Sequence, residues 1–261
     1  AESFAAFNAI RRHLIGSKTS RTKEQWEAAI VKQKEKRRQQ VMHSKGAYLP
    51  PLAHVLTSAN TCPADKGIGV RDANVAVLVV GDGGSPRIAG TCALRTKWTC
   101  VSVDPQIADS IDLTKQEALP KWHVNPIERV LCVPALIQDV DLAECLESKE
   151  KEQTMQSFDK LVVVLMHSHV TLRQALQPLV RSKWSGSFLG VVACPCCNWS
   201  ESQSMIAGRP PTVEYVDDCM GTVKNEIRVW RFSDDELCSL LSELISHEDE
   251  HPMIEERKRQ R

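Results

Sequence analysis

Three glycines and an aspartate directly follow an apolar run in the stretch VAVLVVGDGGSPRIAG, residues 75–90. Glycine allows positive φ angles and lets a ligand approach the main chain closely. In an α/β sheet, ligands bind beyond the carboxyl ends of the strands, most often at the first turn from a strand into a helix. We therefore interpret Gly81, Asp82, Gly83 and Gly84 as a cofactor-binding turn, with Ser85 as the cap of the helix that follows.

A second carboxylate, Asp104, ends the next apolar run, TCVSVD at 99–104. A carboxylate at the end of the second strand is placed to accept hydrogen bonds from both hydroxyls of a ribose, which predicts a cofactor that carries a nucleoside. A dinucleotide favours the spacing GxGxxG, and counting from Gly81 puts Pro86 where the third glycine belongs, which argues against NAD. A tight turn and a helix-capping aspartate are the plain structural alternative.

Two further apolar runs end in residues that could do chemistry. The first, VLMHSHVTL at 164–172, contains His167 and His169, and the second, VVACPCCNW at 191–199, contains a Cys-Pro-Cys-Cys sequence. A neutral imidazole can take a proton from a hydroxyl, so both histidines are candidate catalytic residues. A zinc site needs about four His or Cys ligands, and the cysteines lack the usual two-residue spacer, so we predict no metal. Buried thiols and satisfied histidines remain the alternative.

His167 together with Pro-Cys-Cys resembles one group of S-adenosylmethionine (SAM)-dependent methyltransferases, which includes certain eukaryotic tRNA 2′-O-methyltransferases and relatives of less certain activity. The resemblance covers roughly residues 73–232. It implies SAM as the cofactor, with Asp82 to Gly84 beside its methionine moiety and Asp104 on its ribose. It also implies a substrate pocket that contains Pro195, Cys196 and Cys197, and we place Trp199, which follows them, at the mouth of this pocket. Where the family has Cys-Gly, this chain has His169-Val170, and the family's glycine-lysine loop is not reproduced.

Short apolar runs alternate with helical segments from residue 73 onward. The expected strands are 75–80, 99–104, 129–136, 160–167 and 187–194, and the expected helices are 86–97, 105–117, 140–156 and 171–183. Near-continuous apolar strands are typical of a parallel sheet that is covered on both faces. The segments 212–218 and 225–232 then predict a closing antiparallel pair, and a last helix is expected from Ser233. The fold class is therefore α/β, a doubly wound, mostly parallel seven-stranded sheet. This sheet is similar to that of the Rossmann-like methyltransferases.

The first 48 residues hold eleven Lys and Arg against four Glu and are expected to form two helices. Phe4, Phe7, Ile10 and Leu14 fall on one helical face, which resembles an organelle-targeting segment, although a basic docking helix looks the same. We expect residues 1–48 to be a helical extension, 49–72 a connector, 73–248 the methyltransferase-like domain and 249–261 a charged tail. The predicted RNA-binding residues are Lys32, Lys34, Lys36, Arg37 and Arg38.

The composition of the chain argues against two classes of protein, membrane-spanning proteins and disulfide-rich scaffolds. No run approaches the ~20 apolar residues of a membrane span, and the ten cysteines are too scattered for a disulfide scaffold, which favours a reducing, intracellular compartment. Mitochondria are favoured weakly over cytosol or nucleus. The sequence predicts a SAM-dependent protein that methylates or binds tRNA or rRNA. The alternative is a catalytically weak or inactive assembly component of a ribonucleoprotein such as a mitochondrial ribosome, with protein partners on the N-terminal helices.

Overall fold

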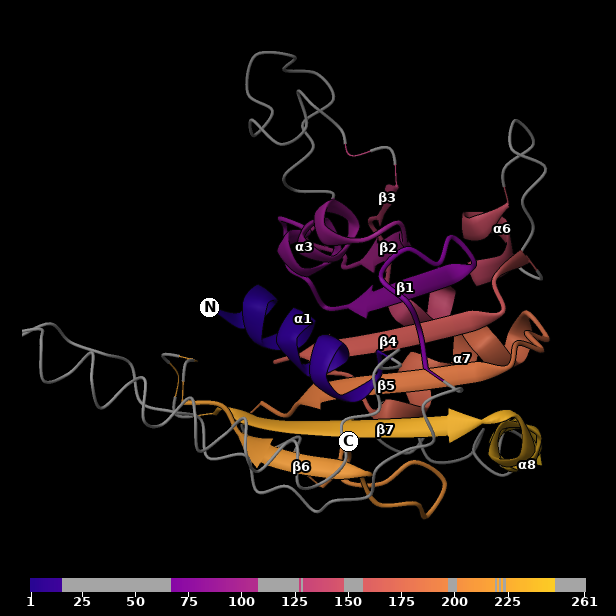
Figure 1. Cartoon of the computed structure of the whole chain (residues 1–261). Coiled ribbons are helices and arrows are strands. Elements are labelled where there is room, and N and C mark those ends of the chain that lie inside the picture. The colour runs from indigo at the N-terminus through magenta and orange to yellow at the C-terminus, as the bar shows by residue number, and fades with distance from the viewer. Residues whose placement is uncertain are drawn as a thin grey trace, which may run out of the picture.

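The apolar runs form a single central sheet in the order β3-β2-β1-β4-β5-β7-β6 (Figure 1). The computed structural model describes residues 1–15, 67–107, 127, 129–147, 157–196, 201–218, 220, 222 and 224–246. Every residue of the first and fifth strands is buried, because helices cover both faces of the sheet. The strands are β1 (Val75–Val80), β2 (Thr99–Val103), β3 (Val130–Val133), β4 (Lys160–Met166), β5 (Phe188–Cys194), β6 (Val213–Val216) and β7 (Glu226–Ser233).

The predicted fold class is confirmed. Strands β1 to β5 pair in parallel, whereas β7 runs antiparallel to both β5 and β6. The expected closing pair is the β6–β7 ladder, with Val213 opposite Val229. The chain passes from β1 outward to β2 and later returns to the other side of β1 as β4. The carboxyl ends of β1 and β4 therefore form the switch point at which α/β sheets bind ligands.

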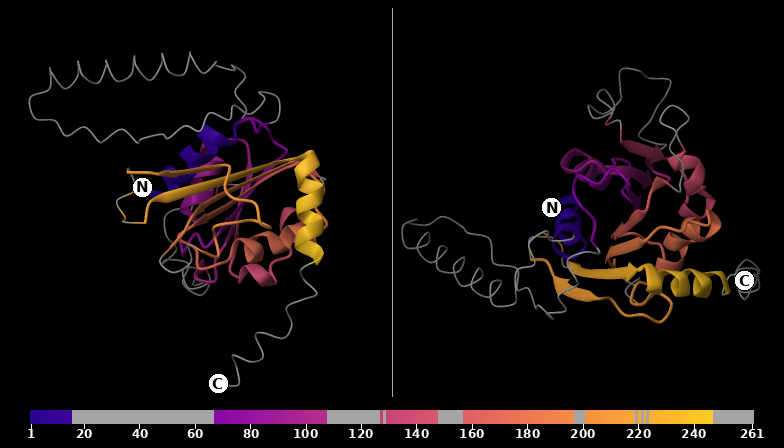
Figure 2. Two further views of the ribbon diagram at one scale, coloured as in Figure 1. Left: turned by 90° about the horizontal axis from the view of Figure 1, so that it is seen from below. Right: turned by 45° about the vertical axis from the view of Figure 1, so that its right-hand side comes forward.

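Helices cover the two faces of the sheet unequally. One face carries α1 (Glu2–His13) and α3 (Arg87–Arg95), which lie side by side (Figures 1 and 2). The other face carries the 3-10 helix η1 (Ile137–Asp139) and the helices α6 (Leu142–Leu146), α7 (Leu172–Arg181) and α8 (Asp234–Ser246). Residues 108–126 and 148–156, which contain most of two predicted helices, lie outside the described residues.

Helix α1 is part of the domain core. Ala6, Ala9, Ile10 and Leu14 are fully buried, and they pack in one cluster with residues of β1, β4, β5 and α3. Of the four apolar residues on the predicted face, only Phe4 is exposed, at 52%. This corrects the expectation that the helix lies outside the fold in a docking extension. An amphipathic helix shows that one face is covered, but the sequence alone does not show by what.

The rest of the N-terminal region, residues 16–66, lies outside the described residues, and so do the predicted RNA-binding residues 32–38. Residues 247–261, which include the predicted charged tail, lie outside them as well. Within the described ranges, no helix has both the length and the apolar composition required to cross a bilayer.

Candidate functional site

The turn after β1 requires glycine at two positions. Gly81 and Gly83 have φ angles of 77° and 76°, in the left-handed region that favours glycine. A Cβ on Gly81 would lie 2.7 Å from the Oγ of Ser168, so this backbone is pressed against the end of β4. A Cβ on Gly83 would have no atom within 4 Å. Gly81 therefore closes the turn against β4, and Gly83 faces open space in which a ligand could lie.

Asp104 connects the ends of β1 and β2. Its Oδ2 accepts a hydrogen bond of 2.9 Å from the backbone N–H of Gly83, and its Oδ1 accepts one of 2.8 Å from the N–H of Gln106. The residue is 8% exposed. Each carboxylate oxygen has two lone pairs, so each can still accept a hydrogen bond from a ligand hydroxyl.

Asp82 points back into the protein. Its Oδ1 accepts a hydrogen bond from the N–H of Ile88, and its Oδ2 accepts bonds from the N–H of Ala89 and from the hydroxyl of Ser102, at 3.0, 3.1 and 3.2 Å. The carboxylate thus caps the first turn of α3. The predicted cap, Ser85, does not fill this role, because the N-cap residue is Pro86 and makes no side-chain bond.

Burial makes the carboxyl of this internal cap a weaker acid than usual. It raises the pKa of the Asp82 carboxyl to about 6, although the three hydrogen bonds oppose the shift. Because the carboxylate already satisfies two N–H groups of α3, those groups are not available to a ligand. Asp82 therefore shapes the turn from the inside, and any contact it makes with a cofactor falls to its backbone.

His167 lies at the end of β4, between β5 and α1. Its φ angle is 54°, and its N–H donates to the carbonyl of Cys194 at 2.9 Å. Its Nε2 lies 3.9 Å from the Sγ of Cys194 and 3.6 Å from the Oε1 of Glu2. The first turn of α1 thus places a carboxylate beside the predicted catalytic histidine. His169, the other predicted catalytic residue, is exposed.

The predicted substrate pocket is described only in part. Pro195 is buried and Cys196 is half-buried, directly beyond β5, whereas Cys197 and Trp199 lie outside the described residues. Burial raises the pKa of the nearby Cys194 thiol to about 12, so this thiol is not ionised at neutral pH. Among the described residues, no three or more His, Cys, Asp or Glu side chains gather in a way that could hold a metal ion.

Sequence reasoning missed the residues that connect these loops. Gln203, which is fully buried, donates from its Nε2 to the carbonyls of Ser168 and Val170 at 2.9 and 2.6 Å. The segment after β5 therefore holds the loop after β4. Within the described structure, the Oγ of Ser168 and the Oε1 of Gln203 are buried without a hydrogen-bond partner. The sequence offered no signal for these contacts, because they join segments that are distant along the chain.

These residues fit a nucleoside cofactor with a polar tail. The open space at Gly83 lies beside a carboxylate that can accept from ribose hydroxyls. The unpartnered hydroxyl of Ser168, packed behind Gly81, is a buried polar group of the kind that usually has a partner in native proteins. A polar group bound at this turn would supply one.

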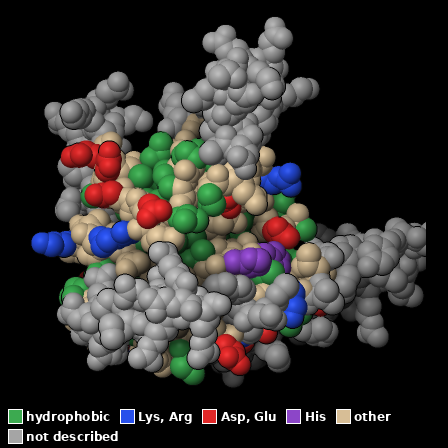
Figure 3. All heavy atoms as spheres, turned by 180° about the vertical axis from the view of Figure 1, so that it is seen from behind, with side chains coloured by type: hydrophobic (Ala, Val, Ile, Leu, Met, Phe, Trp, Pro, Cys, Tyr) green, Lys and Arg blue, Asp and Glu red, His purple; other side chains and the backbone are tan. Residues whose placement is uncertain are grey.

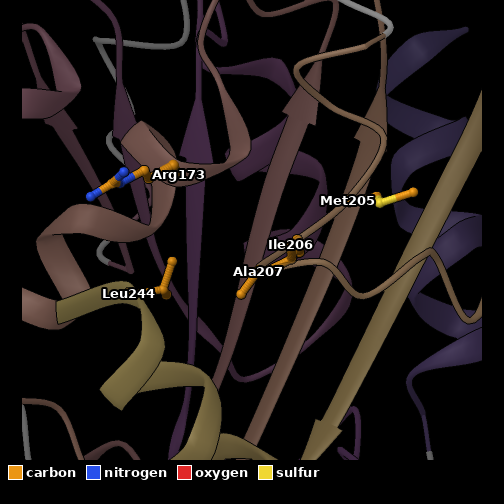
Figure 4. Close-up of a pocket in the computed structure, with 5 residues that line it drawn as sticks. All are labelled: Arg173, Met205, Ile206, Ala207 and Leu244. Carbon is orange, nitrogen blue, oxygen red and sulfur yellow. The ribbon is translucent and has the colours of Figure 1, made fainter. Parts of the chain in front are cut away.

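A separate apolar pocket of about 270 Å³ lies on the other face, between α7, the segment at 205–207 and α8 (Figure 4). None of the predicted site residues lines it. Its described lining residues are Arg173, Met205, Ile206, Ala207 and Leu244.

Comparison with known proteins gives similarity in structure only. The sequence matches no family model, and the comparison with curated proteins found no match. Similar solved structures include a SAM-dependent methyltransferase from Aquifex aeolicus, with 14% identity over 48% of this chain and 58% of that one and a TM-score of 0.31. The 16S rRNA (adenine(1408)-N(1))-methyltransferase from Catenulisporales acidiphilia has 16% identity over 60% and 86%, with a TM-score of 0.37.

A variant of the protein MtNAS, solved in complex with S-adenosylmethionine, has 15% identity over 60% of this chain and 54% of that one, with a TM-score of 0.36. This chain covers less than two thirds of the Aquifex aeolicus and MtNAS proteins. Superpositions at these scores carry no argument about function. The strand order and the antiparallel β7 are those of the Rossmann-like methyltransferase fold, and this likeness concerns the fold alone.

Proposed function

We propose that this protein is a SAM-dependent methyltransferase that acts on RNA. The observation that carries the proposal is the hydrogen bond between the N–H of Gly83 and the carboxylate of Asp104. It joins the glycine turn after β1 to the acid after β2 at the carboxyl edge of the sheet. An α/β sheet of this kind binds the ribose and the adjoining part of a nucleoside cofactor at that edge.

Three residues would hold the cofactor. Asp104 would accept hydrogen bonds from the ribose hydroxyls with the lone pairs that remain on its oxygens. Gly83 would let the cofactor pass close to the main chain, since no side chain fills the space there. The buried hydroxyl of Ser168 would bond a polar group of the methionine moiety. Asp82 and Gly84 belong to the same turn, and the carboxylate of Asp82 fixes its shape.

SAM, when bound, supplies an activated methyl group together with its own leaving group. His167 would accept the proton of the acceptor hydroxyl, with Glu2 stabilising the imidazolium that forms. We assign His169 to the same acceptor site. Pro195, Cys196, Cys197 and Trp199 would form the wall of the substrate pocket. The protein then has to orient the hydroxyl and exclude water.

The proposed acceptor is tRNA or rRNA. Lys32, Lys34, Lys36, Arg37 and Arg38 would contact its phosphates, which gives affinity that is independent of sequence and sensitive to salt. The basic N-terminal region also favours a mitochondrial location, where such an enzyme would meet organellar RNA. The alternative is a catalytically weak or inactive assembly component of a ribonucleoprotein, whose role would not need SAM.

Titration calorimetry with SAM on the full chain tests the proposal. We expect binding by the wild type and weaker binding by Asp104→Asn, by on the order of 1–3 kcal/mol, because a charged acceptor is lost. Asp139→Asn is the matched control, since Asp139 is exposed in η1 and lies apart from the glycine turn. Thermal unfolding of each variant separates lost binding from lost folding. Absence of SAM binding by the folded wild type would overturn the proposal in favour of the assembly component.

A further inference from the structure

We propose that a second surface, on the α1–α3 side of the domain, binds the phosphates of the RNA substrate. We call it the basic face and define it by the exposed residues Arg11, Arg71, Arg95 and Lys97. This inference deepens the proposed function and depends on RNA being the acceptor. It assigns RNA contacts to the domain itself, in addition to those predicted for residues 32–38.

Backbone contacts make the basic face continuous. The N–H of Lys97 donates to the carbonyl of Val70 at 3.0 Å, which places Lys97 beside Arg71. The N–H of Ile68 donates to the carbonyl of Leu14 at 3.1 Å, which joins the same turn to the end of α1. Arg11 belongs to the last turn of α1. Arg95, in the last turn of α3, completes the set next to Lys97.

Among the described residues, few acidic side chains lie on the elements that form this face. The described residues of α1, of α3 and of the turn at 67–72 contain two acidic side chains, Glu2 and Asp72. Asp72 is paired with Lys160 at 3.1 Å, and Glu2 faces His167 at the far end of α1. The opposite side of the molecule, seen in Figure 3, shows red acidic and blue basic side chains mixed among hydrophobic ones. A surface of one sign of charge attracts a polyanion by long-range steering and by release of counterions.

An aromatic ring lies among these charges. The guanidinium carbon of Arg95 is 5.1 Å from the ring centroid of Phe4 and 5.6 Å from that of Phe7. Phe4 is 52% exposed, so its ring is accessible beside the guanidinium. An exposed aromatic ring next to an arginine is an arrangement on which an unpaired base can stack. The exposed ring beside the arginine therefore favours single-stranded RNA, whose unpaired bases can stack, over a ligand that offers phosphates alone.

The described chain stops at Ile15 and resumes at Gly67, beside the basic face, and Ile15 and Ile68 pair in a short parallel bridge. The predicted RNA-binding residues Lys32 to Arg38 belong to the intervening part of the sequence. One RNA that binds the basic face could therefore also contact them.

Three of the four basic residues are arginines, whose planar guanidinium groups bind phosphate through two parallel hydrogen bonds. A phospholipid surface would present phosphates as well, and it is therefore an outcome that the test must separate.

The experiment measures binding of a fluorescent single-stranded RNA to the full chain by anisotropy across a series of salt concentrations. For the double variant Arg71→Gln with Lys97→Gln, we expect the slope of log K against log salt to become shallower by about 0.7 for each lost phosphate contact. Phe4→Ala should weaken binding with little change in slope. Lys183→Gln is the matched control, because Lys183 is exposed at the end of α7 on the other face.

Calorimetry with SAM on the same variants distinguishes the two proposals. Unchanged SAM affinity together with the shallower slope supports the basic face. An unchanged slope in the double variant overturns it, and so does a wild type that binds SAM but not RNA, while the cofactor site still stands. Tighter binding to phosphatidylserine vesicles than to RNA, lost in the same double variant, would identify a membrane surface instead.

Discussion

The glycine turn after β1 and the ends of β4 and β5 lie on the same edge of the sheet but are held in different ways. The turn is held by α3 and by the end of β2, which are the next two elements along the chain. Asp82 is bonded to the backbone of α3, and Asp104 is bonded to Gly83. The ends of β4 and β5 are held by distant segments, namely Glu2 of α1 and Gln203 of the segment after β5. The first region is therefore held mainly by α3 and β2, the next elements along the chain, and the second by segments that lie farther away in the sequence.

In the proposed function, this difference separates the cofactor site from the acceptor site. A locally held turn keeps its geometry when distant elements move, which suits a site that must retain one cofactor. The acceptor side depends on α1 and on the 201–209 segment, so its geometry can change when those elements shift. Each of the following experiments perturbs one region and measures the other.

The largest effect is expected for Ile10→Ala, because Ile10 is fully buried between α1 and the sheet. Removing its outer carbons should lower the free energy of unfolding by about 2–5 kcal/mol. Urea unfolding measures the loss, and hydrogen exchange should show that amides at the end of β4 lose protection more than those of the glycine turn. Phe4→Ala, on the exposed face of the same helix, is the control and should cost far less. Equal loss of protection in both regions would contradict the comparison.

His167→Ala should lower the rate of methyl transfer by roughly 10²-fold, because a general base contributes at least that much. SAM affinity should stay nearly constant, since the side chain lies on the acceptor side. Steady-state kinetics and calorimetry measure the two quantities. Glu2→Gln should slow transfer only by a few-fold, because the carboxylate is half exposed and acts through the histidine. A large loss of SAM affinity in His167→Ala would show that the two regions are one site.

Gly81→Ala and Gly83→Ala form a matched pair. Both place an alanine at a positive φ, which costs about 1–2 kcal/mol of stability. Only the Gly81 methyl meets another atom, the Oγ of Ser168 at 2.7 Å, so Gly81→Ala should be the more destabilising in thermal or urea unfolding. Gly83→Ala should instead have the larger effect on SAM binding. Equal stabilities of the two variants would mean that the end of β4 shifts at little cost to make room for the added methyl group.

The Asp82 carboxyl should make the stability depend on pH. Burial raises its pKa to about 6 in the folded protein, against about 4 in an unfolded chain. Between these values the folded state holds a proton that the unfolded state has released, so raising the pH through this window lowers the stability. Its contribution is present below about pH 4 and is lost above about pH 6, with a magnitude on the order of 1–3 kcal/mol.

Comparing wild type with Asp82→Asn by urea unfolding at several pH values isolates this effect, because the other titrating groups cancel. The difference in stability between the two proteins should shift in favour of the variant as the pH rises from 4 to 6.5. A constant difference across this range would show that folding leaves the pKa of Asp82 unchanged.

Much of the fold could be predicted from the sequence, and less of the site. The strands and the glycine turn were predictable, because buried strands are apolar runs and Gly81 and Gly83 meet a backbone requirement that is local. The position of α1 was missed: Phe7, Ile10 and Leu14 indicate a covered face, but a targeting segment has the same pattern. Ser102 and Gln203 act through contacts across the fold, and a single sequence carries no signal for such pairs.

The pairing of Ile15 with Ile68 has a consequence for the cost of folding. Seating α1 on the sheet brings together two points of the chain that are far apart in the sequence, and the entropy lost in such a closure grows with the logarithm of their separation. Each halving of that separation would return about 0.6 kcal/mol. A chain in which a short linker joins Ile15 to Gly67 should therefore keep α1 in place and unfold at a higher urea concentration. Such a chain, still carrying the basic face but lacking Lys32 to Arg38, would measure how much RNA affinity belongs to the domain alone.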